Sequence, residues 1–497
     1  MKSLRVPLIL FPILALSACG SLPLGFLHPK AKKESSVSVY RSVALRDGIK
    51  GLEPQSPLQF QPLATSSEKE LNLPTFEVNP TERHQAMDGF GATLTESCAI
   101  NLTKLPPKLQ HETLEKIFSK TSGAGFDLLR LPMSATDFSD SKAGSYTYDD
   151  TLKGIPDLGF RHFSMDRDEK SFSLIREAQA INPDLQILIS PWSPPAWMKT
   201  NHELNGGGLD YEHYQDLANY FVRAIQEYRK RSINVTMLTI QNEPGYATSD
   251  YPSMGMSTDE QIKFISKYLG PTLAQNHSKV RLFAHDHNWD MVNEVNKILD
   301  DAPTKKYVSG VAYHCYGGYR WQMLDSMNRH PTIPTLQDEC SGTTRSNAPD
   351  DFAWWLDNQS IGAVNMGTTG ALGWNLCLDE KGGPRSGGCK DCRGMITTDF
   401  TNKDPVVTYN PEFYALSQVS RFIRPGSRRL DVKASAIPKG KTDSDALEAT
   451  AFSNPDGDFT FVAQNPTDKE AKFRVLLVAQ FLTYELPAKS AVTLTWK

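Results

Sequence analysis

The sequence lacks long hydrophobic runs and blocks of like charge. Beyond its first residues, no stretch of the 497 reaches the roughly 20 apolar residues that a transmembrane helix needs. The 53 Lys and Arg and 57 Asp and Glu give a net charge of −4, and no block of five or six like charges occurs. This composition describes a globular protein rather than a multi-span membrane protein, and it gives no reason to expect a nucleic-acid partner.

Cysteine and paired metal ligands are also scarce. The chain has seven cysteines, and its single CxxC is followed by no second CxxC or His pair at metal spacing. The HDH at 285–287 lacks a third ligand at typical spacing, so we expect no metal and no other cofactor. Apart from Cys19, an even six cysteines remain, which permits disulfides in an exported chain. One short bridge is expected near the segment KGGPRSGGCKDC, with its pairing open among Cys377, Cys389 and Cys392.

The amino terminus is typical of an export signal. It reads MKSLRVPLILFPILALSAC, with basic Lys2 and Arg5, an apolar run and small residues before Cys19. The tetrad LSAC resembles the bacterial lipobox, which implies acylation of Cys19. We therefore expect a signal peptide at 1–18, a tether at 19–40 and attachment to the outer membrane or periplasmic envelope through lipid alone. A plain cleaved signal peptide, with secretion, is the alternative.

Short apolar runs alternate with amphipathic stretches from 85 to 404. In the helical stretch 212–231 the apolar residues recur on one stripe, which faces a sheet: Leu217, Phe221, Ala224, Ile225 and Tyr228. Eight runs are typical of strands: QAMDGFGATL, FDLLRLPM, LQILISPW, VTMLTIQNE, VRLFAHDH, VSGVAYHCY, TLQDEC and ALGWNLCL. This pattern predicts an α/β fold, a (β/α)8 TIM barrel over 85–404.

The remaining segments have the alternation of β-strands. Over 405–497, FTFVAQN, RVLLVAQF and AVTLTW alternate apolar and polar residues, and Val492, Leu494 and Trp496 share one face. Residues 41–84 also read as extended and contain several prolines. We expect a β-sandwich over 405–497, attached to the barrel and joined by strands from 41–84.

Two glutamates stand at predicted strand ends, where reacting groups gather in a TIM barrel. Glu243 ends the fourth candidate strand and Glu339 the seventh, so they face each other across the barrel mouth. An acid and a carboxylate that flank one bond suit cleavage of a sugar acetal. The amide of Asn242 can bond a sugar 2-hydroxyl, whereas Asp338 is expected to be a buried structural partner or a rim group.

Nine segments connect these residues to a known family. MDGFGATLTES, LLRLPMSATDFS, ISPWSPPAWMKTN, LTIQNEP, YLGPTL, YHCYGG, DECSG, GWNLCLDEKGGP and FIRPGSRR resemble, in order and spacing, the glucosylceramidase-like branch of glycoside hydrolase family 30. The resemblance covers about residues 80–430. It implies a barrel with an attached β-sandwich and a retaining β-glycosidase.

The resemblance also implies roles for individual residues. Glu243 matches the general acid/base, Glu339 the nucleophile and Arg130 the guanidinium beside the nucleophile. Further positions match residues that hold glucose or lie near the carboxylates: Asp137, Trp192, Asn242, His314, Tyr316, Trp374 and Asn375. Cys315 stands where relatives usually carry an aromatic residue, which leaves the aglycone side of the pocket open.

The expected reaction is double displacement at a β-glucosidic bond, with the carboxyl groups about 5–5.5 Å apart and a raised pKa for Glu243 in the free enzyme. We expect glucosylceramide as the substrate, cleaved to glucose and ceramide. The alternatives are an endo-β-1,6-glucanase or another β-glycoside or xylan hydrolase, and, from a different class, a non-catalytic carbohydrate-binding lipoprotein. The expected partners are thus a β-glucoside or glycolipid and, through the lipid anchor alone, a membrane.

Overall fold

A computed structural model describes residues 36–152, 155–435 and 446–497 of the chain. The predicted signal peptide, Cys19 and most of the predicted tether lie outside these residues. Among the described residues, no helix combines the length and the apolar character needed to cross a membrane.

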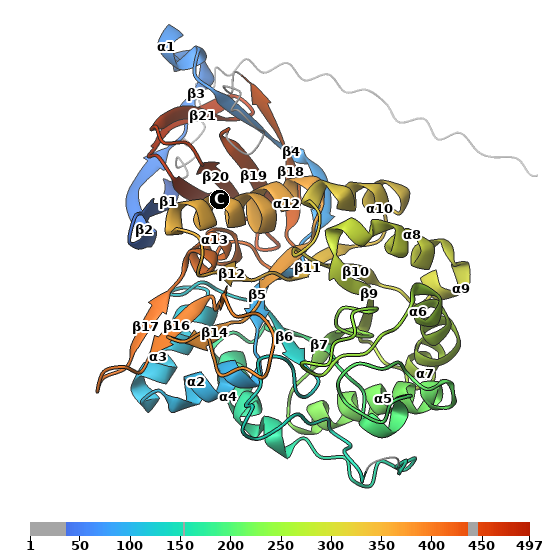
Figure 1. Ribbon diagram of the computed structural model, residues 1–497. Coiled ribbons are helices and arrows are strands. Elements are labelled where there is room, and N and C mark those ends of the chain that lie inside the picture. The colour runs from blue at the N-terminus through green and yellow to red at the C-terminus, as the bar shows by residue number, and fades with distance from the viewer. Residues whose placement is uncertain (1–35, 153–154, 436–445) are drawn as a thin grey trace, which may run out of the picture. The chain divides into compact units, whose positions relative to one another are not determined.

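Eight parallel strands form a closed barrel (Figure 1). In order around it they are β5 (Gly89–Thr93), β6 (Leu128–Pro132), β7 (Gln186–Ser190), β8 (Val235–Thr239), β9 (Arg281–Asn288), β10 (Gly310–His314), β11 (Thr335–Glu339) and β13 (Gly370–Gly373). Seven of the strands each contribute one fully buried side chain to an interior apolar cluster: Leu128, Leu188, Met237, Phe283, Ala312, Leu336 and Leu372. Each predicted strand overlaps one of the eight, which confirms the predicted barrel.

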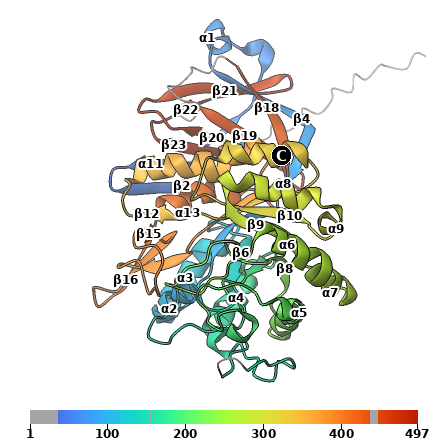
Figure 2. The same cartoon turned by 45° about the vertical axis from the view of Figure 1, so that its right-hand side comes forward.

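Helices alternate with these strands and cover the barrel (Figure 2). They include α2 (Glu96–Lys104), α3 (Pro107–Phe118), α4 (Glu169–Ile181), α5 (Tyr214–Lys230), α6 (Thr258–Phe264), α7 (Gly270–Gln275), α8 (Val292–Asp300), α9 (Ala302–Lys305), α10 (Met323–Arg329), α11 (Ala348–Trp355), α12 (Ile361–Met366) and α13 (Pro411–Ser420). The predicted apolar stripe of α5 is buried along its whole length. Ser257 caps α6 in a reciprocal hydrogen-bonded box with Glu260, which fixes where this helix begins.

Strands from both ends of the chain form one ten-stranded sheet. Its order is β2 (Gly48–Gln59), β1 (Ser36–Leu45), β23 (Ser490–Trp496), β20 (Phe459–Asn465), β19 (Glu448–Ser453), β18 (Arg428–Ser435), β4 (Thr75–Ala86), β21 (Ala471–Leu477), β22 (Gln480–Leu486) and β3 (Gln61–Pro62). The predicted face of Val492, Leu494 and Trp496 is buried in the core of this sheet. Because Val37 and Val39 are buried there too, β1 begins at Ser36, inside the range predicted as tether.

The segment between the barrel and the β-sandwich differs from the predicted boundary at 404. Residues 405–420 were expected in the sandwich, but β17 (Val406–Tyr409) pairs with β16 (Ile396–Asp399), and α13 packs between β5 and α11 of the barrel and β1, β2 and β23 of the ten-stranded sheet. Two short strands bring the glycine-rich segment to the barrel mouth, since β15 (Cys392–Arg393) pairs with β12 (Gly342–Thr343), just after β11.

Candidate active site

A pocket of about 320 Å³ lies where the barrel strands end. It is lined by Asp137, Trp192, Asn242, Glu243, Tyr246, Tyr251, His287, Asn288, Tyr316, Glu339, Trp374, Cys389 and Cys392. Seven of these residues were predicted from the sequence. A larger cavity of about 420 Å³ in the β-sandwich has a single carboxylate, Glu70, in its lining and so offers no acid–base pair.

Glu243 and Glu339 meet in this pocket. Glu339 is the last residue of β11, and Glu243 follows β8 with a backbone φ of 48°, in the left-handed region. The backbone N–H of Glu243 donates to the carbonyl of Asp286 at 2.9 Å, which holds this unusual conformation. One carboxyl oxygen of each glutamate and a ring nitrogen of His314 all lie within 4.8 Å of one another. This separation fits retaining glycosidases, whose carboxyl groups are about 5–5.5 Å apart, and not inverting ones, at about 6.5–9.5 Å.

Arg130 of β6 connects the residues beneath the pocket. Its side chain is fully buried, and its guanidinium forms an ion pair with Glu339. Nη2 donates to Asn242 Oδ1 at 2.8 Å and to Asp286 Oδ1 at 2.9 Å, and Nε lies 3.4 Å from Asp338 Oδ2. Burial opposes the charge of Arg130, but the surrounding carboxylates outweigh burial and raise its pKa. Arg130 is therefore a fixed cation beside the predicted nucleophile.

His314 is fully buried and does not line the pocket, so the structure offers no direct contact between it and a sugar. Its Nε2 lies 2.7 Å from Asp286 Oδ1, and its Nδ1 lies 3.3 Å from Glu243 Oε1. Burial lowers the pKa of His314, but the charge of Glu339 and the contacts with Asp286 and Glu243 raise it well above its usual value. His314 is thus a second buried cation, placed under both glutamates.

These cations set the pKa of each glutamate. Burial raises the pKa of Glu339, although the charges of His314 and Arg130 oppose this rise. Burial also acts to raise the pKa of Glu243, but the hydrogen bond and the charge of His314 outweigh burial, so the pKa of Glu243 is lowered. The raised pKa predicted for Glu243 is therefore wrong, because the sequence does not show a cation beneath it. Two carboxyl groups this close titrate as a pair.

The pocket wall combines flat aromatic rings with a buried acid. Trp192 and Trp374 stack with ring centroids 5.1 Å apart and an interplanar angle of 18°. The guanidinium carbon of Arg130 lies 4.9 Å from the Trp192 centroid. Burial, together with the charges of Glu339 and Glu243, raises the pKa of Asp137 well above its usual value. Apolar faces beside a few polar groups are typical of a site for a neutral polar ring such as a sugar.

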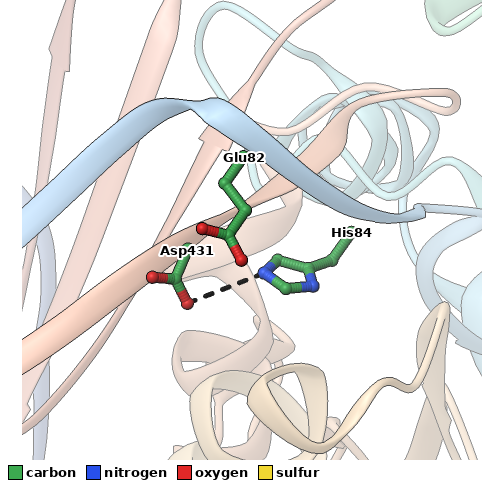
Figure 3. A group of neighbouring side chains, drawn as sticks. All are labelled: Glu82, His84 and Asp431. Carbon is green, nitrogen blue, oxygen red and sulfur yellow. Dashed lines mark ion pairs between the residues drawn. The ribbon is translucent and has the colours of Figure 1, made fainter.

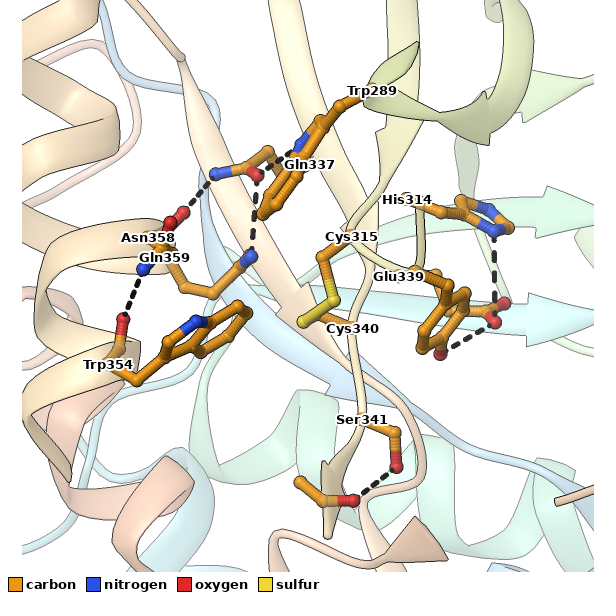
Figure 4. The surroundings of a disulfide bond; sticks show 12 residues. Trp289, His314, Cys315, Gln337, Glu339, Cys340, Ser341, Trp354, Asn358 and Gln359 are labelled. Carbon is orange, nitrogen blue, oxygen red and sulfur yellow. Dashed lines mark hydrogen bonds and ion pairs between the residues drawn. A yellow bond between two sulfur atoms is a disulfide. The ribbon is translucent and has the colours of Figure 1, made fainter. Parts of the chain in front are cut away.

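A disulfide joins the ends of two barrel strands next to this site. Cys315 follows β10 and Cys340 follows β11, and their bridge lies between the aromatic side chains of Trp289 and Trp354 and the residues His314 and Glu339 (Figure 4). The bridge involves Cys315, the position at which the family resemblance would place an aromatic residue. It ties the loop after β10 directly to the strand end that carries Glu339.

Tyr316, the residue after Cys315, contacts the nucleophile position. Its hydroxyl donates to Glu339 Oε1 at 3.0 Å. The second disulfide, Cys389–Cys392, lines the pocket and is the short bridge expected in the glycine-rich segment. Cys377 is instead buried as a free thiol.

Asn375, like Arg130 and His314, is a predicted substrate-binding residue that lies outside the pocket lining. It is fully buried outside the pocket lining, and its Oδ1 accepts a hydrogen bond from Thr95 at 2.7 Å. Sequence reasoning missed four lining residues: Tyr246, Tyr251, His287 and Asn288. A signal existed for two of them, since His287 ends the predicted strand 280–287 and Asn288 follows it directly.

Three groups of side chains among the described residues have the composition of a metal site. Two belong to the network above, and in both Arg130 already forms an ion pair with a carboxylate. The third, Glu82, His84 and Asp431, lies on β4 and β18 of the sandwich (Figure 3). There His84 Nε2 is 3.7 Å from Asp431 Oδ1, and Glu82 is exposed.

The chain is similar to known proteins in family, in sequence and in structure. The TIM-barrel domain of glycosyl hydrolase family 30 matches residues 87–423, and the β-sandwich domain of the same family matches 426–494. An endo-1,6-β-D-glucanase of Neurospora crassa is 31% identical over 410 residues, 80% of this chain and 82% of that protein. The lysosomal acid glucosylceramidase of Mus musculus is 28% identical over 433 residues, 80% and 78% of the two chains. The structure titled as the endo-β1,6-glucanase BT3312 superposes with a TM-score of 0.81 at 29% identity, covering 93% of this chain and 99% of that one.

Proposed function

The chain belongs to glycosyl hydrolase family 30, and on that premise we propose that it hydrolyses β-1,6-linked glucan with retention of configuration. As a glycoside hydrolase it is an enzyme, which rules out the alternative of a non-catalytic carbohydrate-binding lipoprotein. The observation that carries the reaction is the approach of the Glu243 and Glu339 carboxyl oxygens to within 4.8 Å in one pocket.

In the first step Glu339 attacks the anomeric carbon. The reactive form has Glu339 ionised, because the guanidinium of Arg130 and the hydroxyl of Tyr316 both donate to its carboxylate. These two donors also fix the direction of the attacking oxygen. The bond from the sugar to the leaving oxygen breaks as the bond to Glu339 forms, giving a glycosyl ester.

Glu243 supplies the proton that the leaving oxygen needs. Once Glu339 is esterified, its negative charge is gone, and Glu243 then loses a proton more readily. It accepts a proton from the incoming water, which attacks the ester from the side that the leaving group vacated. The cation His314, at 3.3 Å from Glu243, favours this ionised form.

Residues of the pocket wall hold the glucose unit. Because Asn242 Oδ1 accepts a hydrogen bond from Arg130, its Nδ2 is the group free to donate to the sugar 2-hydroxyl. Asp137 can bond other hydroxyls, and Trp192 and Trp374 present apolar faces to the ring.

Two observations favour glucan over the glucosylceramide expected from the sequence. The similar proteins above include an endo-1,6-β-glucanase in both the sequence and the structure comparison. The loop after Tyr316 also carries Tyr319 and Trp321, which are 60% and 57% exposed and stack with centroids 4.5 Å apart at an angle of 5°. Flat exposed rings in the loop that follows a pocket residue suit further sugar units of a chain.

We also propose that the enzyme is exported and anchored by acylation of Cys19. The support is the amino-terminal sequence, with its basic start, apolar run and LSAC tetrad. Labelling of expressing bacteria with a palmitate analogue tests this: wild type should be labelled and Cys19→Ser should not. Label that persists in Cys19→Ser would reject the anchor.

The substrate is tested with a panel of β-1,6-gluco-oligosaccharides, β-1,6-glucan and glucosylceramide in mixed micelles. We expect kcat/KM to be at least about tenfold higher for the β-1,6 oligosaccharides, with the β-anomer as the first product by NMR. Glu339→Gln should be inactive on every substrate, whereas Glu112→Gln, an exposed control on α3, should match wild type. A preference for glucosylceramide would reassign the substrate without affecting the catalytic residues.

A further inference from the structure

Asp338, the residue before the nucleophile position, is a fully buried acid that the mechanism above does not use. Neither of its carboxyl oxygens has a hydrogen-bond partner among the side chains and backbone groups of the described chain. The nearest cationic atoms are Arg130 Nε at 3.4 Å and His314 Nε2 at 3.7 Å, and the latter is engaged with Asp286 at 2.7 Å. A buried carboxylate that lacks donors is very unfavourable.

One neighbour of Asp338 has the same chemistry, namely the carboxyl group of Asp286. Carboxyl oxygens of Asp286 and Asp338 and a nitrogen of His314 all lie within 4.8 Å of one another, so the two carboxyl groups are neighbours in the buried network. Two ionised carboxylates have no hydrogen to share. A hydrogen bond between them therefore requires a proton on one, as in other sites where two carboxyl groups meet.

The charges of the network require the same proton. Three buried carboxyl groups, those of Asp286, Asp338 and Glu339, and the partly buried carboxyl group of Glu243 surround two cations, Arg130 and His314. Double displacement starts with one proton on Glu243, which leaves three carboxyl groups for two cations. If Asp338 is neutral, two anions face two cations and the buried network is balanced.

The surroundings place the proton on Asp338 rather than on Asp286. Asp286 accepts hydrogen bonds from Arg130 at 2.9 Å, His314 at 2.7 Å and Ser190 Oγ at 2.8 Å, all of which stabilise its negative charge. Burial opposes that charge, but Arg130 and His314 outweigh burial and lower the pKa of Asp286. Burial and the charge of Asp286 raise the pKa of Asp338 well above its usual value. His285, the neighbour of Asp286, is neutral, because burial lowers its pKa to about 3.

We propose that Asp338 is a protonated carboxylic acid whose hydroxyl donates to Asp286, and that it acts as a positioning residue for both glutamates. It does not line the pocket and works through Asp286. The side chain of Asp286 orients Arg130 and His314, while its backbone carbonyl accepts from Glu243 N–H at 2.9 Å. The proposal rests on the glycosidase site but not on the identity of the glucan.

The variant Asp338→Asn distinguishes two roles for Asp338. One is a neutral acid that donates a hydrogen bond to Asp286, and the other is an ionised carboxylate that balances the charge of Arg130 or His314. An amide has the shape of the protonated acid, can donate the same hydrogen bond and cannot ionise. We therefore expect D338N to fold as stably as wild type and to keep kcat/KM on an aryl β-glucoside within about tenfold of it. The alkaline limb of the pH profile of kcat/KM for D338N should match that of wild type or extend to higher pH. The reason is that the proton that Asp338 would lose at high pH is no longer present.

Asp338→Ala, which removes the donor, is the paired variant. We expect its kcat to fall at least about tenfold below that of D338N with little change in KM, since Asp338 does not touch the sugar. The infrared carbonyl absorption of protonated carboxyl groups should lose the contribution of one group in D338N, while the contribution of Glu243 remains.

A D338N enzyme that unfolds, loses more than about tenfold in kcat/KM, or leaves the carboxyl band of wild type unchanged would overturn the proposal. A failure of the catalytic assignment gives a different result, since Glu339→Gln would then stay active whatever D338N does.

Discussion

Replacing Arg130 by lysine tests how the pocket holds its nucleophile. The guanidinium reaches Glu339 through one nitrogen, and Asn242 and Asp286 through another at 2.8 and 2.9 Å. Lysine keeps the positive charge but presents it at a single nitrogen, so it can satisfy one of these positions and not all three.

The size of the effect follows from the lost contacts. A hydrogen bond to a charged group contributes about 1.5–3 kcal/mol, so two lost contacts amount to about 3–6 kcal/mol. At about 1.36 kcal/mol per tenfold in rate, kcat/KM should fall roughly 10²- to 10⁴-fold. Arg130 acts to lower the pKa of Glu339, so a less well placed cation should leave this pKa higher. The acid limb of the pH profile of kcat/KM should then move to higher pH.

The assay is kcat/KM of R130K on an aryl β-glucoside across pH, with near-UV circular dichroism and urea unfolding to verify the fold. Arg176→Lys is the matched control, since this arginine on α4 is 41% exposed and pairs only with Glu169 at 2.6 Å among the described residues. The control should match wild type. A folded R130K that keeps kcat/KM within tenfold of wild type would refute the idea that the guanidinium fork fixes Glu339.

Three further predictions concern groups around the pocket. His314→Asn removes the cation that lowers the pKa of Glu243, so Glu243 keeps its proton longer and the alkaline limb of kcat/KM should move to higher pH; an unchanged limb would contradict this. Trp321→Ala should raise KM for β-1,6-glucan roughly two- to tenfold and leave aryl β-glucoside kinetics unchanged, whereas equal effects on both substrates would argue against a chain-binding role. Replacing Cys315 and Cys340 together by serine opens a loop of 25 residues and should lower the free energy of unfolding by about 2–4 kcal/mol in urea titrations; an unchanged midpoint would speak against this stabilisation.

The barrel and its two glutamates could be predicted because their signals are local in the chain. Each strand is a short apolar run, and Glu243 and Glu339 follow such runs at the ends where a barrel gathers its reactive groups. The sandwich strands near the carboxyl terminus have the same local signal. By contrast, nothing local shows that β1 pairs with β23, or that β4 lies between β18 and β21.

The residues that tune the glutamates depend on geometry that the sequence does not carry. His285 and Asp286 adopt φ of 80° and 57°, where the pairing of β9 with β10 shifts register, and this irregularity breaks simple alternation along the strand. The place of Asp286 between Arg130 and His314 could not be read from alternation. Asn375 shows the converse, since a matching motif position proved to be a buried partner of Thr95.

The central claim is tested most directly by trapping the covalent intermediate. Incubation with an activated 2-deoxy-2-fluoro-β-glucoside, followed by proteolysis and mass spectrometry, identifies the residue that bonds to the sugar. We predict one glycosyl group per chain, on Glu339, and the same label with slower turnover in Glu243→Ala. Label on another residue, or no label together with an α-anomer as the first product, would contradict double displacement at Glu339.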